Sequence, residues 1–507
     1  MKALVAAAVV LGAATQTAHA FCGFYVAGGD QQMFNDATQV VLMRDGTRTA
    51  LSMQNNYKGP PDAFAMVIPV PVVLHEGDVK TLPKDVFAHV EQMGAPRLVE
   101  YWEQDPCRVM LEDRNLELVR APATPSPVRH ESARGDLGVT IEAKFVVGEY
   151  QIVILSAKDS TGLDTWLRQE KYNIPPGAEP LLRPYVENGS KFFVAKVDPA
   201  KVTFVDGRAA LSPLRFHYDD DRFELPIRLG LANSSGTQDL IVNILAPDQR
   251  YEVANYPDVT IPTNLDVKDS VKDRFGAFYT ALFDATLEKN PGAVVTEYAW
   301  QATTCDPCPG PTLGPADFQL LGADVVAKPQ AYPNWVLTRL HMRYGKDLKD
   351  DLEFRAAEPI VGGREHVVDP ATGRIENGAR ADSYNNFQGR YIIRHPWTGA
   401  VTCQDPHWHV WGGPPNGAYN GPISATGLAF APRGQVKLPA VVNSDVPELG
   451  IVAGKAPPPR GPETAPAYAP TKTTGCQTGD PAGLACGLAL IGLAFSRSRR
   501  RGARQEP

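Results

Sequence analysis

The chain has 507 residues, 43% of them hydrophobic, and a formal net charge of −7. Without Lys2 at the start and the five arginines and Glu506 at the end, 44 basic and 56 acidic residues remain, a net charge of −12. An acidic chain of this kind lacks the basic surface that nucleic acids require, so we expect no nucleic-acid partner. The 44 glycines and 45 prolines indicate many turns and short strands rather than an all-helical protein.

Residues 1–20 have the pattern of a signal peptide. Lys2 is followed by the apolar run 3–14 and by the small-x-small sequence that ends at Ala20. The run is shorter than the roughly twenty residues that span a bilayer. We therefore expect cleavage after Ala20 and export of the chain.

Residues 21–440 are expected to form the folded part, possibly as two subdomains. Two strand-like runs meet at Asp45-Gly46, which is a strong hairpin signal because both residue types tolerate positive φ. Two more runs meet at Gly148. Further predicted strands are 62–72, 192–197, 226–231, 240–245, 335–344 and 390–394. The predicted fold is α+β, mostly antiparallel β-sheet with a sandwich-like N-terminal unit and a few helices.

Two helices are predicted. One begins at Ser160 or Thr161, which are good N-terminal caps. The other spans 269–289 and ends before Asn290-Pro291-Gly292. Its apolar residues recur at spacings of three and four, which predicts a helix face packed in the core; they are Val271, Phe275, Phe278, Leu282 and Ala285.

Two charged patterns have both a structural and a functional interpretation. Asp219, Asp220 and Asp221 are consecutive, but they lack the ligand spacing and glycine of a calcium-binding loop, so a solvated acidic turn is expected. The alternative is that they supply carboxylates to a hydrolase. In the strand 335–344, Arg339 and Arg343 share a face with His341, which predicts the solvent-facing side of a half-exposed strand. An anion site is the alternative there.

No familiar catalytic motif is present, and we expect no metal and no cofactor. The chain lacks the nucleophile elbow, the zinc-protease helix, the phosphate-binding loop and the dinucleotide fingerprint. The segment around Cys403, His407 and His409 is the most metal-like, because residues two apart on a strand face the same side. A second ligand-bearing segment is missing, so a surface loop is predicted.

Five cysteines lie in the folded part, and an oxidising compartment would pair them as disulfides; they are Cys22, Cys107, Cys305, Cys308 and Cys403. The sequence leaves their connectivity open. The Cys305–Cys308 pair has the spacing of a redox centre, but Asp306 opposes thiolate formation and no helical pattern follows. A structural staple is therefore predicted, with a thiol oxidoreductase as the disfavoured alternative.

The segment 384–397 combines aromatic and amide side chains. Such side chains suit contacts with carbohydrate, since sugars stack on aromatic faces and bond to amides. A packed loop is the alternative. The candidate binding residues are Tyr384, Asn385, Asn386, Phe387 and Trp397.

The C-terminal part has two further regions. Residues 441–475 form a proline-rich linker, and residues 476–507 contain Cys476, the apolar run 482–495 and an arginine cluster. This order resembles the C-terminal sorting tail of myxobacterial surface proteins, the MYXO-CTERM type. The resemblance implies transient membrane retention, processing near Cys476 and display on the surface of a Gram-negative cell.

The folded part resembles the bacterial domain of unknown function family 2330, over about residues 22–406. The stretches that carry the resemblance are "FAMVIPVP", "GEYQIVILSAKDSTGLDTWL", "NWVLTRLHMRYGKDL" and "YNNFQGRYIIRHPW". It implies an exported protein without an established activity, so no catalytic residue is transferred. Together, these features predict a surface-anchored binding or envelope-associated protein with an unknown extracellular ligand. A polymer hydrolase is the alternative.

Overall fold

The computed structural model describes residues 24–453, with gaps at 28–33, 59–63, 108–137, 171, 173, 175–176, 203, 206–207, 210, 234–235, 329–332, 365–375, 377, 416, 418–420, 425, 428–430 and 432. The predictions on Ala20, Cys22, Cys476 and most of the linker lie outside these residues. None of the helices in the described part combines the length and hydrophobicity that a membrane crossing requires.

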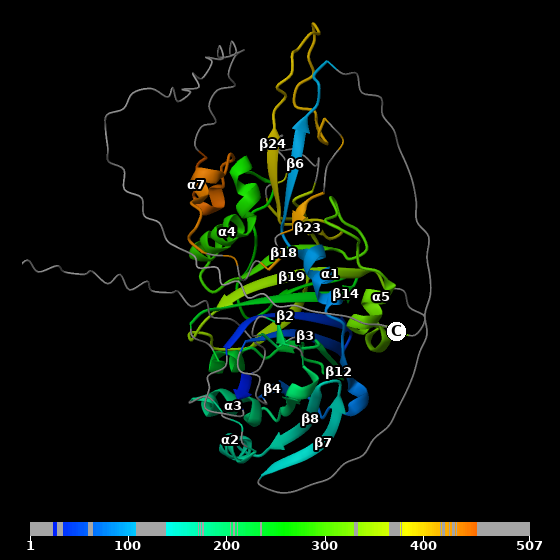
Figure 1. Cartoon of the computed structure of the whole chain (residues 1–507), viewed down its shortest axis with the longest axis vertical. Coiled ribbons are helices and arrows are strands. Elements are labelled where there is room, and N and C mark those ends of the chain that lie inside the picture. The colour runs from blue at the N-terminus through cyan, green and yellow to red at the C-terminus, as the bar shows by residue number, and fades with distance from the viewer. Residues whose placement is uncertain are drawn as a thin grey trace, which may run out of the picture. The chain divides into compact units, whose positions relative to one another are not determined.

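The first sheet has five antiparallel strands, and their order is β1 (Phe24–Ala27), β4 (Phe64–Val70), β9 (Lys191–Val197), β8 (Tyr150–Ala157) and β7 (Val139–Val147). The predicted hairpin at Gly148 is confirmed. Helices α2 (Ser160–Gln169) and α3 (Ala178–Glu187) pack on one face, where Trp166 and Leu182 meet Val67 and Val194. Figure 1 shows both helices beside β7 and β8.

The second sheet has thirteen strands. Its centre is the sequence β3 (Arg48–Lys58), β2 (Phe34–Asp45), β14 (Gln238–Pro247), β19 (Trp335–Tyr344) and β18 (Val294–Gln301). The other strands are β5 (Val79–Thr81), β10 (Phe204–Val205), β11 (Arg208–Ala209), β12 (Leu214–Asp219), β16 (Asp258–Thr260), β21 (Ile360–Gly362), β22 (Arg380–Ala381) and β23 (Asn386–Gln388).

The two sheets pack face to face and form the predicted sandwich. The hairpin between β2 and β3 turns at Gly46, whose φ is +59°, as its sequence indicates. One core cluster joins Val40 and Leu240 of the large sheet to Ile68 and Phe193 of the small one. The prediction of an α+β, mostly antiparallel fold is confirmed.

Two smaller sheets complete the fold. One contains β13 (Glu224–Leu225), β20 (Leu352–Ala357) and β15 (Arg250–Val253). The other contains β17 (Leu265–Asp266), β24 (Arg390–His395), β6 (Arg97–Glu103), β25 (Trp411–Gly412) and β26 (Ile423–Ser424). Strands β6 and β24 are parallel and lie side by side in Figure 1, although about 290 residues separate them in the chain.

Helices cover the large sheet. The predicted helix at 269–289 is a 3₁₀ turn, η4 (Asp269–Arg274), followed by α4 (Phe275–Lys289), and its predicted apolar face packs in the core. Short helices α7 (Leu438–Val441) and η7 (Pro447–Leu449) contact α4. A separate hydrophobic core cluster contains side chains of α1 (Asp85–Gly94), α5 (Pro315–Phe318), η5 (Gln319–Ala323) and α6 (Asp324–Val326). The other short helices are η1 (Glu76–Asp78) and η2 (Pro199–Lys201).

One predicted strand is wrong. Residues 228–233 form the 3₁₀ helix η3 (Arg228–Asn233). The backbone N–H groups of Ile227 and Arg228 donate to the carboxylate of Asp351 at 2.7 and 3.0 Å. A side chain from a distant segment thus takes the donors that a strand partner would have used. The compact unit that contains all these elements extends to Ala456.

Candidate functional site

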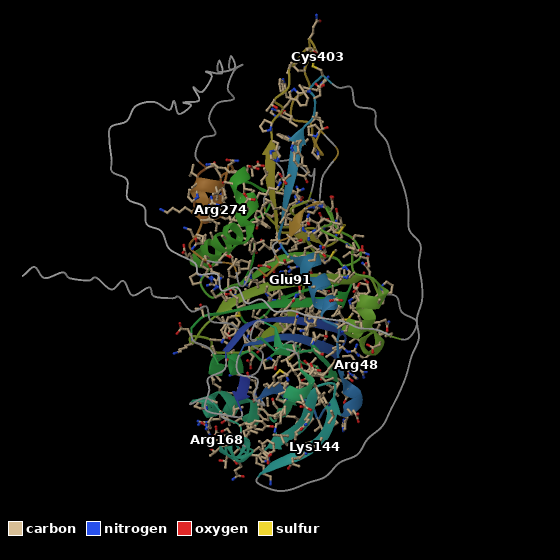
Figure 2. All side chains as sticks on the ribbon, viewed as in Figure 1. Arg48, Glu91, Lys144, Arg168, Arg274 and Cys403 are labelled. Atoms are coloured by element: carbon tan, nitrogen blue, oxygen red, sulfur yellow. A yellow bond between two sulfur atoms is a disulfide. The ribbon has the colours of Figure 1, made fainter. Side chains whose placement is uncertain are left out.

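Four of the seven tryptophans lie on one structural unit, which we call the arm: β6, β24, β25 and the loops 104–107 and 396–410. Trp102 pairs with His395 across β6 and β24, and their rings stack at 4.7 Å between centroids. The guanidinium of Arg394 lies 5.2 Å from the ring centre of Trp411. The disulfide between Cys107 and Cys403 joins the two loops, and Figure 2 shows Cys403 at the far end of the strands.

A buried carboxylate orders the longer loop of the arm, 396–410. Glu103 accepts hydrogen bonds from the backbone N–H groups of Trp397 at 3.0 Å and His409 at 2.8 Å. Gln104 donates to the carbonyl oxygens of Trp102 and Gly413. Charge-assisted bonds to backbone amides are strong, so Glu103 holds the loop 396–410 in one conformation.

The end of the arm exposes apolar and aromatic surface. Trp408 is 46% exposed and Val401 40%, while His407, His409 and Gln404 are also exposed. Aromatic faces beside amide and imidazole groups can stack on a flat ligand and bond to its hydroxyl groups.

The five predicted binding residues do not share one surface. Phe387 is fully buried in the core and Asn385 is 7% exposed, with its side-chain oxygen accepting from the backbone of Ile360. Asn386 is half-buried in β23, and Tyr384 is exposed but bonded to Arg364 at 2.9 Å. Only Trp397 belongs to the arm. The sequence did contain a signal for the arm, since Trp408 lies between His407 and His409 of the metal-like segment and Trp411 follows two residues after it.

The metal alternative at Cys403, His407 and His409 finds no support in the described residues. Cys403 is in a disulfide, and the segment is a loop in which His409 has a φ of +65°, so strand alternation does not apply.

A different cluster, Glu100, Asp269 and His395, has ligand atoms within 4.8 Å of one another. The ammonium of Lys272, however, already lies 2.6 Å from Glu100. Burial would raise the pKa of Glu100, but hydrogen bonds from Lys272 and His395 outweigh burial and lower it. The cluster is therefore an ion-pair group between the arm and η4.

The prediction that one row of side chains on β19 faces solvent is wrong, because Arg339 and His341 are buried. The Nε of Arg339 lies 2.6 Å from Glu297, and its Nη1 lies 2.7 Å from Glu91 of α1. His341 bridges Glu297 at 2.7 Å and Asp239 at 3.1 Å.

Helix α4 covers this face of the sheet, and the ring of its Phe283 stacks on His341 at 3.8 Å. Burial would raise the pKa of Glu297, but His341 and Arg339 hold it at about 2. Every charge here has a buried partner, which indicates a structural role.

The three aspartates of the predicted acidic turn lie in different surroundings. Asp219 pairs with Arg48 at 2.6 Å, and Asp221 is exposed. Asp220 instead lines a pocket of about 280 Å³, together with Glu224 of β13, Glu353 of β20 and residues of α3 and β4.

The Cys305–Cys308 pair forms a disulfide within its own loop. Arg97 donates to the carbonyl oxygen of Pro307 at 2.8 Å, and Gln92 donates to that of Pro309 at 2.9 Å. Gln388 donates to the carbonyl oxygen of Asp306. Three side chains thus fix this loop against β6, α1 and β23, as expected for a staple.

Comparison with known proteins gives one match. The model of a family described as an uncharacterized protein conserved in bacteria, DUF2330, matches residues 16–355. The match covers three of the four stretches that carry the predicted resemblance, but it ends before "YNNFQGRYIIRHPW". No curated protein and no solved structure matches the chain.

Proposed function

Since the chain belongs to the DUF2330 family of uncharacterised bacterial proteins, we propose that it is an exported, surface-anchored binding protein whose contact surface is the arm. The segments 1–20 and 476–507 support export and anchoring by their sequence patterns. The disulfides Cys107–Cys403 and Cys305–Cys308 fit the same location, because disulfides persist in oxidising compartments.

The observation that carries the binding role is the exposed Trp408 at the end of an ordered arm. Glu103 and the Cys107–Cys403 disulfide fix the loops before any ligand arrives, so little ordering entropy is lost on binding. The aromatic and amide groups favour a carbohydrate polymer of the envelope or its surroundings as the ligand.

Sedimentation with insoluble polysaccharide tests this role. We expect the purified chain to bind peptidoglycan sacculi, chitin or cellulose, and Trp408→Ala to weaken that binding about tenfold, the loss typical of an aromatic contact residue. Val146→Ala is the matched control, because Val146 is a 54% exposed apolar residue on β7. Equal binding by Trp408→Ala and the unchanged protein would refute the arm as the contact surface.

The mass of the surface-displayed form tests the anchor. Processing near Cys476 removes the arginine cluster, so the mature mass is expected to lack residues 497–504. A mature chain that retains them contradicts processing and leaves only an uncut membrane anchor.

The hydrolase alternative is predicted on Asp219, Asp220 and Asp221, of which Asp220 lines a pocket with other carboxylates. Glu224 and Glu353 are opposite each other on neighbouring strands of one sheet. Glycoside hydrolysis uses two carboxyl groups on either side of the scissile bond, about 5–10 Å apart, so two groups side by side on one sheet do not by themselves favour it. Release of reducing ends from the same polysaccharides, lost in Glu224→Gln, would replace the binding role with hydrolysis. Reduction of a disulfide substrate faster than by free thiol would favour the oxidoreductase alternative instead.

A further inference from the structure

The pocket near Asp220 is built by elements of both sheets of the sandwich. Its volume is about 280 Å³, and its walls come from the end of β4, from α3, from β12 and from the β13–β20 pair. Ligand pockets usually measure about 300–1,000 Å³, so this one suits a small molecule or a single side chain.

The lining of the pocket is acidic. It contains five carboxyl groups and two arginines. Asp351 is already compensated, because it bonds to the guanidinium of Arg228 at 2.9 and 3.2 Å and to the hydroxyl of Tyr185 at 2.7 Å. The remaining acidic groups are Asp220, Glu224, Asp350 and Glu353.

Arg222 is the only other cation among the lining residues that the structure describes. Its side chain is 52% exposed, and its contacts with Asp220 and Glu224 are both 3.4 Å long. No described cation lies within 4 Å of the carboxylates of Asp350 and Glu353. Within the described residues, the lining therefore carries more negative charge than its ion pairs neutralise.

Two of these carboxylates repel each other. Glu224 and Glu353 are register partners on β13 and β20, and like charges directly opposite on antiparallel strands are destabilising. Burial, together with the neighbouring Glu353 and Asp220, raises the pKa of Glu224 although Arg222 opposes this. A bound cation beside the pair removes the repulsion.

The rest of the lining favours an organic cation over a metal ion. The rings of Phe216, Tyr218 and Tyr185 and the prolines Pro69 and Pro71 form apolar walls, which contact methylene groups and attract ammonium ions. In the described part of the chain, no three pocket carboxylates bring their oxygen atoms within 4.8 Å of one another, as a metal site requires. Among these residues, such a group occurs only at Glu100, Asp269 and His395, outside the pocket.

We infer that this pocket binds an alkylammonium group, carried either by a small free diamine or by a lysine side chain. The walls hold the alkyl chain while Glu224 and Glu353 pair with the ammonium. The site is separate from the arm, so this inference does not depend on the binding role proposed for the arm.

Calorimetric titration with 1,4-diaminobutane tests the inference, with 1,4-butanediol as the uncharged probe of equal length. We expect the diamine to bind and the diol not to bind. Glu224→Gln and Glu353→Gln should each weaken diamine binding about tenfold, the usual effect of losing one charge-assisted hydrogen bond. Arg222→Gln should strengthen binding, because Arg222 competes for the same carboxylates.

Titration with Nα-acetyl-lysine methylamide distinguishes the two sources of the ammonium group. Tighter binding of this compound than of the diamine identifies a lysine side chain as the ligand.

The matched control is Asp221→Asn, which removes the same charge from an exposed neighbour outside the lining. Equal weakening by Asp221→Asn and Glu224→Gln would show only long-range attraction and overturn the inference. Equal binding of diol and diamine, or displacement of diamine by micromolar calcium, would also overturn it. Misfolding is not a confounding outcome for Glu224→Gln, because relief of the repulsion should leave its thermal midpoint unchanged or raised.

Discussion

Arg339 and Glu297 form a salt bridge in which neither side chain is exposed to solvent. Arg339→Met leaves the carboxylates of Glu297 and Glu91 without their guanidinium partner inside the protein. Breaking a buried pair in this way costs about 3–5 kcal/mol, because Glu91 loses its cation partner and, among the described residues, the desolvated Glu297 keeps only His341 as a cationic partner. We expect urea denaturation at pH 7 to show this loss in the free energy of unfolding.

Arg48→Met is the matched control for that measurement. Arg48 pairs with Asp219 at the same distance of 2.6 Å, but the two side chains are 41% and 52% exposed. An exposed pair of this kind contributes about 0–1 kcal/mol. A similar loss in both variants would contradict the stabilising role assigned to the buried network.

The ionisation of Asp258 makes the stability of the fold depend on pH. Burial raises its pKa to about 6, although hydrogen bonds from Thr296 and the backbone of Val253 oppose this. In the unfolded chain the carboxyl ionises near pH 4. The protonated folded form is therefore favoured below pH 4, and that stability is lost as the pH rises through about 6.

Asp258→Asn cannot ionise and keeps an acceptor for the hydroxyl of Thr296. We expect this variant to be more stable than the unchanged protein by about 3 kcal/mol at pH 8, with little difference at pH 4. The measurement is the free energy of unfolding at both pH values. An equal gain at pH 4 and pH 8 would show that ionisation of Asp258 is not its cause.

Alternation in the sequence identifies residues that share a face of a strand, but not what covers that face. The pattern correctly groups Arg339, His341 and Arg343. Their partners Glu91 and Asp239 lie 248 and 102 residues away from the side chains they bond, on α1 and β14. The burial of this row therefore depends on distant elements, which no local pattern contains.

At the scale of elements, the disulfides differ in the length of chain that they close. Cys107 and Cys403 are 296 residues apart, whereas Cys305 and Cys308 are three apart. In the loop-entropy account, the longer closure stabilises the fold by about 3–4 kcal/mol more than the shorter one. We expect the double variant Cys107→Ser/Cys403→Ser to lower the free energy of unfolding more than Cys305→Ser/Cys308→Ser. Equal losses would contradict this ordering.

Local elements are the ones that the sequence predicts well. The β2–β3 and β7–β8 hairpins and the core face of α4 follow from turn residues and spacing within about twenty residues. The parallel pairing of β6 with β24 has no such signal, because the partners lie about 290 residues apart. The arm, and with it the surface around Trp408, could therefore not be assembled from the sequence.

At the scale of the whole molecule, the fold extends beyond the residues that match the family. The match ends at 355, but β23 and β24 follow it and pair with β18 and β6, while β21 pairs with β23. The core around α4 also includes later residues, namely Ile360, Phe387, Tyr391, Ile393, Val436, Leu438, Val441, Val442, Val446, Leu449 and Ile451. The folded unit therefore needs the chain after residue 355.

A chain that ends at 355 is expected to lose cooperative unfolding, because one face of α4 and the edges of β6 and β18 are left uncovered. Each large core side chain removed costs roughly 2–5 kcal/mol, and the eleven lost here far exceed the 5–15 kcal/mol stability of a typical protein. A chain that ends at 456 is the matched control and should retain the full thermal transition, since the compact unit ends there. A cooperative transition in the shorter chain would show that residues 356–456 form a separate addition rather than part of the core.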